Sequence, residues 1–212
     1  MQREIINPVI GHKCYFIKTS EETNGAYSHY ELTLSPGSKN PRHKHSVYAE
    51  TYTVLEGALA LTVNDQEMTL RVGESYTVEK GVSHRFLNKE KNNTKVAVRL
   101  TPGHTGAENK LRILFGLAAD GMTDDEGVPY CMDTTALMAD ISDTQLAGIF
   151  SLLFKPFTKQ IAEHARRTGL EIKLLTKYCS KHSVVIDKSH RRTIRSPEKN
   201  KSSNQSESSI TK

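Results

Sequence analysis

The chain has 212 residues, contains no tryptophan and is 36% hydrophobic, with a mean hydropathy of −0.52. This length favours one domain with extensions over two full domains, and the low apolar content predicts that part of the chain stays outside the core. The net charge of +5 would suggest an acidic partner, but residues 187–212 hold seven Lys or Arg against three Asp or Glu and so carry +4 of it.

The three cysteines, Cys14, Cys131 and Cys179, lie far apart and in neither CxxC nor CxxxC spacing. This pattern argues against a disulfide framework and a thiolate zinc site, and it favours a reducing compartment. The first residues lack the apolar segment of a secretory signal, and no window approaches the roughly 18 apolar residues of a membrane-spanning helix. We therefore expect a soluble, cytoplasmic protein.

The first half of the chain shows the alternation of apolar and polar residues that is typical of β-strands. Residues 27–34 alternate with period two, and turns are expected at Ser35-Pro36-Gly37, Glu56-Gly57 and Asn64-Asp65. The predicted strands are 14–17, 27–34, 51–55, 58–63, 68–72, 76–78, 85–88 and 95–100. Short strands with a turn about every 8 to 12 residues predict an antiparallel sandwich or barrel, which ends at Pro102-Gly103.

After this point the apolar residues change to helical spacing. Leu111, Leu114, Phe115 and Ala118 share one face of a predicted helix that stops at Asp120-Gly121. The second half of the chain is therefore expected to be helical.

Ser142 and Gln145 have the spacing of a capping box, which predicts that another helix begins there. We expect Pro156 to kink or break this helix, Gly169 to end it, and residues 170–178 to form a last helix. The apolar stripe of the helix would consist of Leu146, Ile149, Phe150, Leu153, Phe157 and Ile161.

The apolar stripe and the C-terminal tail each allow two interpretations. The cluster at 149–154 favours packing on the barrel or on a second subunit, and an interfacial membrane anchor is the alternative. The tail has the composition of a disordered segment, and its arginines lack the aromatic neighbours that nucleic-acid binding would favour. We divide the chain into a barrel at 1–103, a helical extension at 104–182 and a disordered, solvated tail at 183–212.

Three imidazoles and one carboxylate fall at spacings that a small barrel can converge on one point. His43 and His45 are two apart, so their side chains leave a strand on the same side, whereas His84 comes from a separate strand. Glu50 has the opposite parity, which a bend or bulge must correct. Imidazole and carboxylate suit Mn, Fe, Co, Ni, Cu or Zn, and four ligands leave open positions of the kind found in catalytic sites. These residues are candidate ligands of one divalent transition metal.

The same spacings resemble the two motifs of the cupin superfamily, over about residues 26–102. The first motif is matched by Gly37, five residues, His43-x-His45, four residues, Glu50, six residues and Gly57. The second is matched by Gly73, seven residues, Gly81, two residues, His84, three residues and Asn88. One departure is Glu79, at a position where the family usually has proline. The resemblance implies a six-stranded jelly-roll β-barrel, a metal held by the three histidines and Glu50, and commonly a dimer.

Parity also sorts the neighbours of these four residues. Tyr52 shares the parity of Glu50, and Phe86 and Asn88 share that of His84, so these three either line the pocket or belong to the core. Three basic residues have the opposite parity and should point away from the pocket, which would serve a strongly anionic substrate less well: Arg42, Lys44 and Arg85. The remaining histidines are interpreted as polar surface residues: His12, His29, His104, His164, His182 and His190.

Two classes of function remain open. The first is an enzyme acting on a small oxygen-bearing metabolite, with a dioxygenase using Fe or Mn ahead of a sugar isomerase or epimerase, and with Glu50 as a candidate proton acceptor. The second is a non-catalytic module that binds a metal or metabolite. No helix-turn-helix with a basic recognition face is discernible, so we expect a small-molecule ligand and a homodimer, and neither nucleic acid nor membrane as partner.

Overall fold

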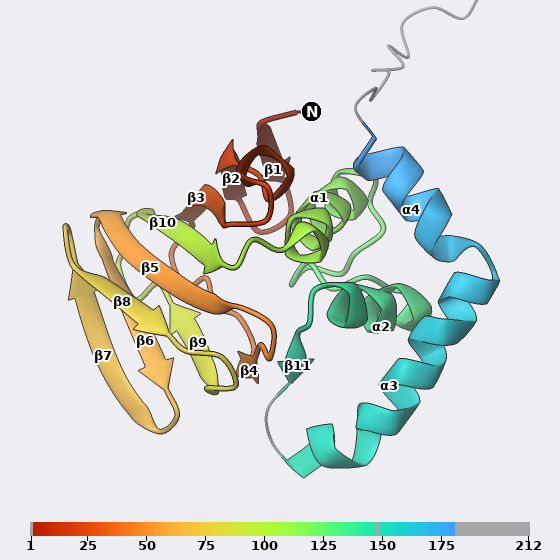
Figure 1. The fold of residues 1–212 in the computed structure, drawn as a ribbon. Coiled ribbons are helices and arrows are strands. Elements are labelled where there is room, and N and C mark those ends of the chain that lie inside the picture. Colours follow the sequence, from red (N-terminus) through yellow and green to blue (C-terminus); the bar gives the residue numbers. More distant parts are fainter. Residues whose placement is uncertain (1, 147–148, 181–212) are drawn as a thin grey trace, which may run out of the picture.

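The computed structural model describes residues 2–146 and 149–180, with the side chains of 149–156 excepted. The tail at 183–212 and the side chains of the predicted cluster at 149–154 lie outside these described parts. The described residues form two β-sheets and the helices α1 to α4, and Figure 1 shows the sheets on one side of the molecule and the helices on the other.

The larger sheet is antiparallel and carries the strictest alternation of buried and exposed residues. Along Ser28–Leu34 every second side chain is buried, as the sequence pattern predicts. In spatial order its strands are β1 (Glu4–Asn7), β2 (His12–Lys18), β3 (Ser28–Leu34), β10 (Thr94–Thr101), β5 (Ala49–Glu56) and β8 (Ser75–Val78). The first of them, β1, was missed because only four residues form it and they show little alternation.

The smaller sheet packs against the larger one and contains two of the short strands that matter for the site. Its strands, in spatial order, are β11 (Gln145–Leu146), β4 (His43–Lys44), β9 (His84–Leu87), β6 (Ala58–Val63) and β7 (Gln66–Arg71). The main core fills the space between the sheets with residues such as Tyr52, Leu59, Leu61 and Val98. Two antiparallel sheets, of six and five strands, form the jelly-roll type of β core that the resemblance implied, with more strands than the six expected.

After a single 3-10 turn at Glu21–Thr23, the helices are α1 (Thr105–Ala119), α2 (Met132–Ile141), α3 (Ile149–Arg167) and α4 (Leu170–Tyr178). Helix α1 belongs to both parts of the molecule: Ala107 and Phe115 lie in the sheet core, whereas Ile113 and Leu117 lie in a second core between the helices. Gly116 of α1 leaves room for the Tyr178 ring of α4, which an added Cβ would strike. Helix α2 was not predicted, because its sequence MDTTALMADI has no clear apolar stripe.

The predicted helix start at Ser142 is wrong. Ser142 instead follows the last turn of α2, where its hydroxyl donates to the Met138 carbonyl at 2.7 Å. The chain then turns at Asp143, whose φ is 50°, and Gln145–Leu146 form strand β11 beside β4. Long-range pairing with the sheet therefore overrides the local capping signal.

Helix α3 passes through Pro156 without a break, and Figure 1 shows it bending before it rises towards α4. Its described buried residues are Ala162 and Ala165, which face the other helices, whereas Phe157 is 59% exposed. The predicted apolar stripe is thus not the packing face over the part of the helix whose side chains are described. No helix among residues 2–146 and 149–180 has the length and apolar character needed to cross a membrane.

Candidate metal centre

The two sheets supply different members of the four-residue cluster. His43 on β4 lies directly opposite His84 on β9 in the smaller sheet, and Glu50 comes from β5 in the larger sheet. The chain bends at Ser46 and Val47 as it crosses from one sheet to the other. This crossing explains the odd spacing between His45 and Glu50, because the two residues leave different sheets.

Each histidine is held by its Nδ1 atom. The Nδ1 atoms of His43, His45 and His84 lie 2.8, 3.0 and 3.0 Å from the backbone carbonyls of Pro41, Asp143 and Val82. A carbonyl only accepts, so Nδ1 carries the proton in all three rings and Nε2 keeps a free lone pair. Such bonds fix both the tautomer and the direction of a metal-binding imidazole.

The free nitrogen atoms converge on the Glu50 carboxylate. Oε2 of Glu50 lies 3.2 Å from Nε2 of His84 and 3.6 Å from Nε2 of His45. One potential ligand atom from each of the four residues lies within 4.8 Å of the others, and all four residues are buried. Three imidazoles and one carboxylate are a fitting donor set for a divalent transition metal. The structure thus brings together all four residues that the spacing singled out.

The protonation states suit metal binding as well. Burial, and then the charges of His84 and His45, lower the pKa of His43 to about 3, so this ring is neutral near pH 7. Burial raises the pKa of Glu50, but the neighbouring imidazoles of His45 and His84 outweigh it and hold that pKa well below its usual range, while Glu50 in turn raises the pKa of His84 against the effect of burial. A neutral imidazole and an ionised carboxylate are the forms that bind metals.

The segment after α2 closes over the bend between His45 and Glu50. The carboxylate of Asp143 accepts hydrogen bonds from Ser46 N at 2.5 Å, Ser46 Oγ at 2.7 Å and Val47 N at 2.7 Å. Burial raises the pKa of Asp143, but these hydrogen bonds outweigh it and lower the pKa below its ordinary value. Sequence analysis missed this residue because its contacts lie nearly a hundred residues away along the chain.

Tyr48 is a second residue that the spacing did not identify. Its ring stacks on His45 with centroids 4.3 Å apart, and its hydroxyl donates to the Ser142 carbonyl at 3.1 Å. Tyr48 therefore joins the ligand segment to the segment that covers it.

The turn before His84 forms without the proline that is usual in the resembling family. Val82 N donates to the Glu79 carbonyl at 3.2 Å, and Gly81 has φ of 78°. A positive φ at the third position of such a turn is readily adopted only by glycine, so Gly81 is what allows this turn. Glu79 leaves the placement of His84 intact.

The three residues proposed to line the pocket lie in different surroundings. The Tyr52 ring is buried edge-on to His84, with centroids 6.4 Å apart, and Phe86 packs on Tyr52 at 6.3 Å. Asn88 is buried in a turn, where its amide donates to the carbonyls of Leu34 and Ser35. The structure therefore places Tyr52 beside the cluster and Asn88 in the scaffold.

The neighbouring basic residues point outwards, as their parity predicts. Arg42 pairs with Asp65 at 2.9 Å, and both Lys44 and Arg85 are exposed. Sequence reasoning missed Lys110 of α1, whose Nζ donates to Thr144 Oγ1 at 2.9 Å; burial lowers the pKa of Lys110 to about 8, and the charge of Glu50 acts against this shift.

Two histidines expected on the surface make contacts inside the fold, and a third, His29, is half-buried on β3. His12 is buried at 9% exposure, with Nε2 lying 2.5 Å from Ser38 Oγ, and burial lowers its pKa to about 4. His104 is half-buried, caps α1 by accepting from Ala107 N, and lies 5.0 Å from the Tyr48 ring. Both predictions failed because the surrounding segments meet only in the fold; His164 is exposed as expected.

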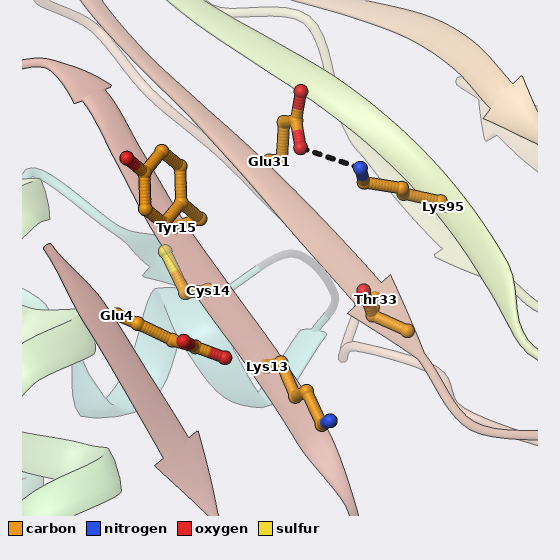
Figure 2. A pocket seen from close by; sticks show the side chains of 7 residues that line it. All are labelled: Glu4, Lys13, Cys14, Tyr15, Glu31, Thr33 and Lys95. Atoms are coloured by element: carbon orange, nitrogen blue, oxygen red, sulfur yellow. Dashed lines mark ion pairs between the residues drawn. The ribbon is translucent and has the colours of Figure 1, made fainter.

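A separate cavity of about 220 Å³ lies on the larger sheet, away from the cluster. Figure 2 shows its side chains, with an ion pair of 2.7 Å between Lys95 and Glu31. Its lining residues are Glu4, Lys13, Cys14, Tyr15, Glu31, Thr33 and Lys95. The ion pair satisfies two of the charges that line this cavity.

Comparison with known proteins supports one family. Residues 30–100 match the model of the cupin domain. The chain is 33% identical over 70 residues to the HTH-type transcriptional regulator PuuR of Escherichia coli (strain K12), which covers 33% of this chain and 38% of that protein. It is 30% identical over 80 residues to the tetracenomycin polyketide synthase protein TcmJ of Streptomyces glaucescens, which covers 38% of this chain and 52% of that protein.

The chain thus spans about half or less of the length of these curated relatives. Among solved structures, an RmlC-like cupin from Shewanella frigidimarina NCIMB 400 matches with a TM-score of 0.42 at 19% identity, covering 49% of this chain and 87% of that chain. The family match covers the strands that carry His43, His45, Glu50 and His84. The chain is therefore similar to the cupin domain over residues 30–100, the stretch that contains all four clustered residues.

Proposed function

We propose that the cluster binds one divalent transition metal, Fe or Mn in the first place, and that the protein is an enzyme acting on a small oxygen-bearing metabolite. The reaction class is that of a dioxygenase or a related oxidoreductase. The observation that carries the proposal is the convergence of one potential ligand atom from each of three histidines and one glutamate within 4.8 Å of one another, all four residues being buried. A metal bound there supplies a Lewis acid with open positions for substrate and oxygen.

The surrounding residues support this role by fixing the ligands before anything binds. Backbone carbonyls hold the Nδ1 atoms, so little ordering remains to be done when a metal enters. Burial of His84, at 1% exposure, limits the access of bulk water. Glu50 serves as the one anionic ligand and as the candidate acceptor of a substrate proton.

Tyr52 is buried beside the cluster, edge-on to the ring of His84. Burial, and then the charge of Glu50, raise the pKa of Tyr52 well above its usual value, and a hydrogen bond with Glu50 adds to this shift. The phenol therefore stays protonated near pH 7 and donates to the carboxylate. In the proposed enzyme Tyr52 holds the carboxylate in place and remains neutral.

A non-catalytic binding module is the second candidate. It is favoured by the similarity to a transcriptional regulator over 70 residues, a length close to that of the matched cupin domain. In this alternative the same pocket binds a metabolite or metal, and the helices pass the occupied state to a partner. A sugar isomerase or epimerase would use the same ligands without consuming oxygen.

The proposal includes the expected cytoplasmic location and homodimer. The three cysteines are free, which supports a reducing compartment. Tyr130 and Met132 are 69% and 73% exposed, and exposed apolar side chains of this size support a contact with a second copy. Binding of nucleic acid stays outside the proposal.

Metal analysis of anaerobically purified protein tests the site. The wild type should contain one divalent metal per chain, and His84→Ala should lose most of it because the variant removes one ligand and its anchoring bond. His164→Ala is the matched control, since this histidine is exposed on α3. Thermal unfolding of all three proteins verifies that loss of metal is not loss of fold. Metal content that His84→Ala leaves unchanged would refute the site.

Oxygen uptake by the metal-loaded protein separates the candidate functions. A screen of small phenols, enols and thiols should give at least one substrate whose oxidation is lost in His84→Ala and kept in His164→Ala. Stoichiometric zinc together with no oxygen uptake would favour an isomerase or a binding module instead.

A further inference from the structure

The segment between α1 and α2 folds into a short hairpin, residues 122–130. Thr123 and Pro129 form an antiparallel bridge across it, and Tyr130 N donates to the Met122 carbonyl at 3.2 Å. Backbone contacts between its two arms thus give the hairpin a defined conformation.

One face of this hairpin is apolar and exposed. Residues at alternate positions of a hairpin share a face, and the buried Thr123 marks the inner one. The outer face carries Met122, Val128 and Tyr130, whose side chains are between 45% and 69% exposed. Met132, two residues farther on, is exposed as well. Neighbouring exposed apolar side chains of this size are typical of a surface that another segment or molecule covers.

The same segment carries negative charge. Between residues 120 and 140 the sequence contains six Asp or Glu and no Lys or Arg. The two acids at its ends are paired with basic residues of α3 and α4. Three others are at least partly exposed and make no ion pair with any residue among 2–146 and 149–180: Asp125, Glu126 and Asp133. An acidic and apolar surface favours an occupant that is basic and apolar.

The stretch of the chain that follows the described helices has this complementary chemistry. Residues 181–195 contain five Lys or Arg against one Asp. The same fifteen residues include four apolar ones: Val184, Val185, Ile186 and Ile194.

This stretch begins close to the hairpin. Helix α4 lies beside α1 (Figure 1), and its end contacts Asp120, two residues before the hairpin: the Asp120 carboxylate lies 2.6 Å from Nζ of Lys177 and accepts from the Tyr178 hydroxyl at 2.7 Å. The described chain ends two residues after Tyr178. An extended chain spans about 3.4 Å per residue, so residues 181–195 are long enough to reach the hairpin. A short tether gives an effective concentration of about 1 mM, so even a weak contact would be occupied.

We propose that residues 181–195 dock on the hairpin of their own chain, with apolar side chains on Met122, Tyr130 and Met132 and basic side chains on the unpaired acids. Docking covers Tyr130 and Met132, the side chains that support a contact with a second copy. The tail therefore competes with that second copy for one surface and limits self-association. This role replaces the solvated state expected from the composition of the tail for its first part.

NMR of the full-length protein labelled with [¹³C-methyl]methionine measures whether the surface is covered. A neutral gadolinium chelate in the solvent speeds the relaxation of exposed methyl groups, and the buried Met138 is the internal reference. The relaxation enhancement of Met122 and Met132 should be low in the wild type. It should rise by about twofold or more when about 0.5 M NaCl screens the contact.

Two variants of the tail make a matched pair, because each reverses three positive charges. The test variant combines Arg191→Glu, Arg192→Glu and Arg195→Glu. The control combines Lys199→Glu, Lys201→Glu and Lys212→Glu, which lie beyond the proposed docking segment. The enhancement of the two methionines should rise by about twofold or more in the test variant and stay near the wild-type value in the control.

A change on the hairpin itself provides the complementary test. Asp125→Asn with Glu126→Gln removes two charges and keeps the backbone bonds of the hairpin, so it should also raise the enhancement of both methionines. Equal enhancement in the wild type and the tail test variant, or an equal rise in the test variant and its control, would overturn the proposal. It would also be overturned by shielding that grows with protein concentration and persists in the test variant, because a second copy would then be the occupant.

Discussion

Replacing Asp143 tests whether the segment after α2 is part of the metal centre. The carboxylate accepts three hydrogen bonds from Ser46 and Val47, and the backbone carbonyl of the same residue accepts from Nδ1 of His45. Asp143→Ala deletes the carboxylate and leaves alanine at φ of 50°. The backbone carbonyl of residue 143 could still accept from Nδ1 of His45, but the hydrogen bonds that fix the position of this carbonyl would be lost.

The cost to stability can be worked out from these contacts. Three partly exposed hydrogen bonds at about 1 kcal/mol each give about 3 kcal/mol. Alanine in the left-handed region adds about 1 kcal/mol, because aspartate and asparagine tolerate this conformation better. The free energy of unfolding of Asp143→Ala should therefore fall by about 4 kcal/mol. Asp143→Asn keeps the backbone preference and one acceptor oxygen, so its loss should be about 2 kcal/mol.

The effect on metal binding should be separate from the effect on stability. Loss of a residue that orients a metal ligand typically weakens affinity by about 10-fold to 100-fold. Asp124→Ala is the control, because the Asp124 carboxylate likewise accepts from two backbone N–H groups, of Glu126 and Val128, in a loop away from the cluster. This variant should lose stability and keep the metal affinity of the wild type.

Urea unfolding of the metal-free proteins and titration with Mn²⁺ or Fe²⁺ measure the two quantities. Our reasoning would be refuted if Asp143→Ala unfolded within about 0.5 kcal/mol of the wild type, the range expected of an ordinary surface change. It would also be refuted if Asp143→Ala and Asp124→Ala bound the metal equally well.

Two further predictions concern the scaffold. In the folded protein the pKa of His12 is lowered from 6.5 to about 4, so between these pH values the unfolded chain binds more protons than the folded one. The contribution of His12 to the free energy of unfolding should therefore be complete above pH 6.5 and fall by about 3 kcal/mol as the pH drops to 4. Urea unfolding of His12→Gln should show a smaller fall over the same pH range. Gly116→Ala should cost about 1–3 kcal/mol despite its better helix propensity, because the new Cβ strikes Tyr178, and the double variant with Tyr178→Ala should cost less than the sum of the single variants.

The parts predicted correctly from the sequence are those fixed by local spacing. Alternation along 27–34 predicts a strand, and the spacing of His43, His45, Glu50 and His84 predicts a cluster that the fold does assemble. The wrong or missing parts depend on contacts between distant segments. The Ser142 capping signal is overridden by pairing of β11 with β4, and α2 has too little periodicity to be recognised.

The contrast between local spacing and long-range contacts also explains why the motif residues do not identify the small molecule that the site would bind. Three of the four clustered residues lie on strands and His45 directly follows β4, so local spacing can encode their geometry, whereas Asp143 contacts His45 from the segment after α2 and Lys110 of α1 bonds to the next residue, Thr144. The helical part of the chain is continuous with the sheets, because Ala107 and Phe115 of α1 lie in the sheet core. The division of the chain into a barrel and a helical extension at residue 103 remains a prediction, and the sheet core includes residues of α1 beyond that position. The choice of small molecule in such a site depends on the residues that the helices and residues 142–146 place around it. Sequence changes there can alter which small molecule binds while the metal-binding residues stay the same.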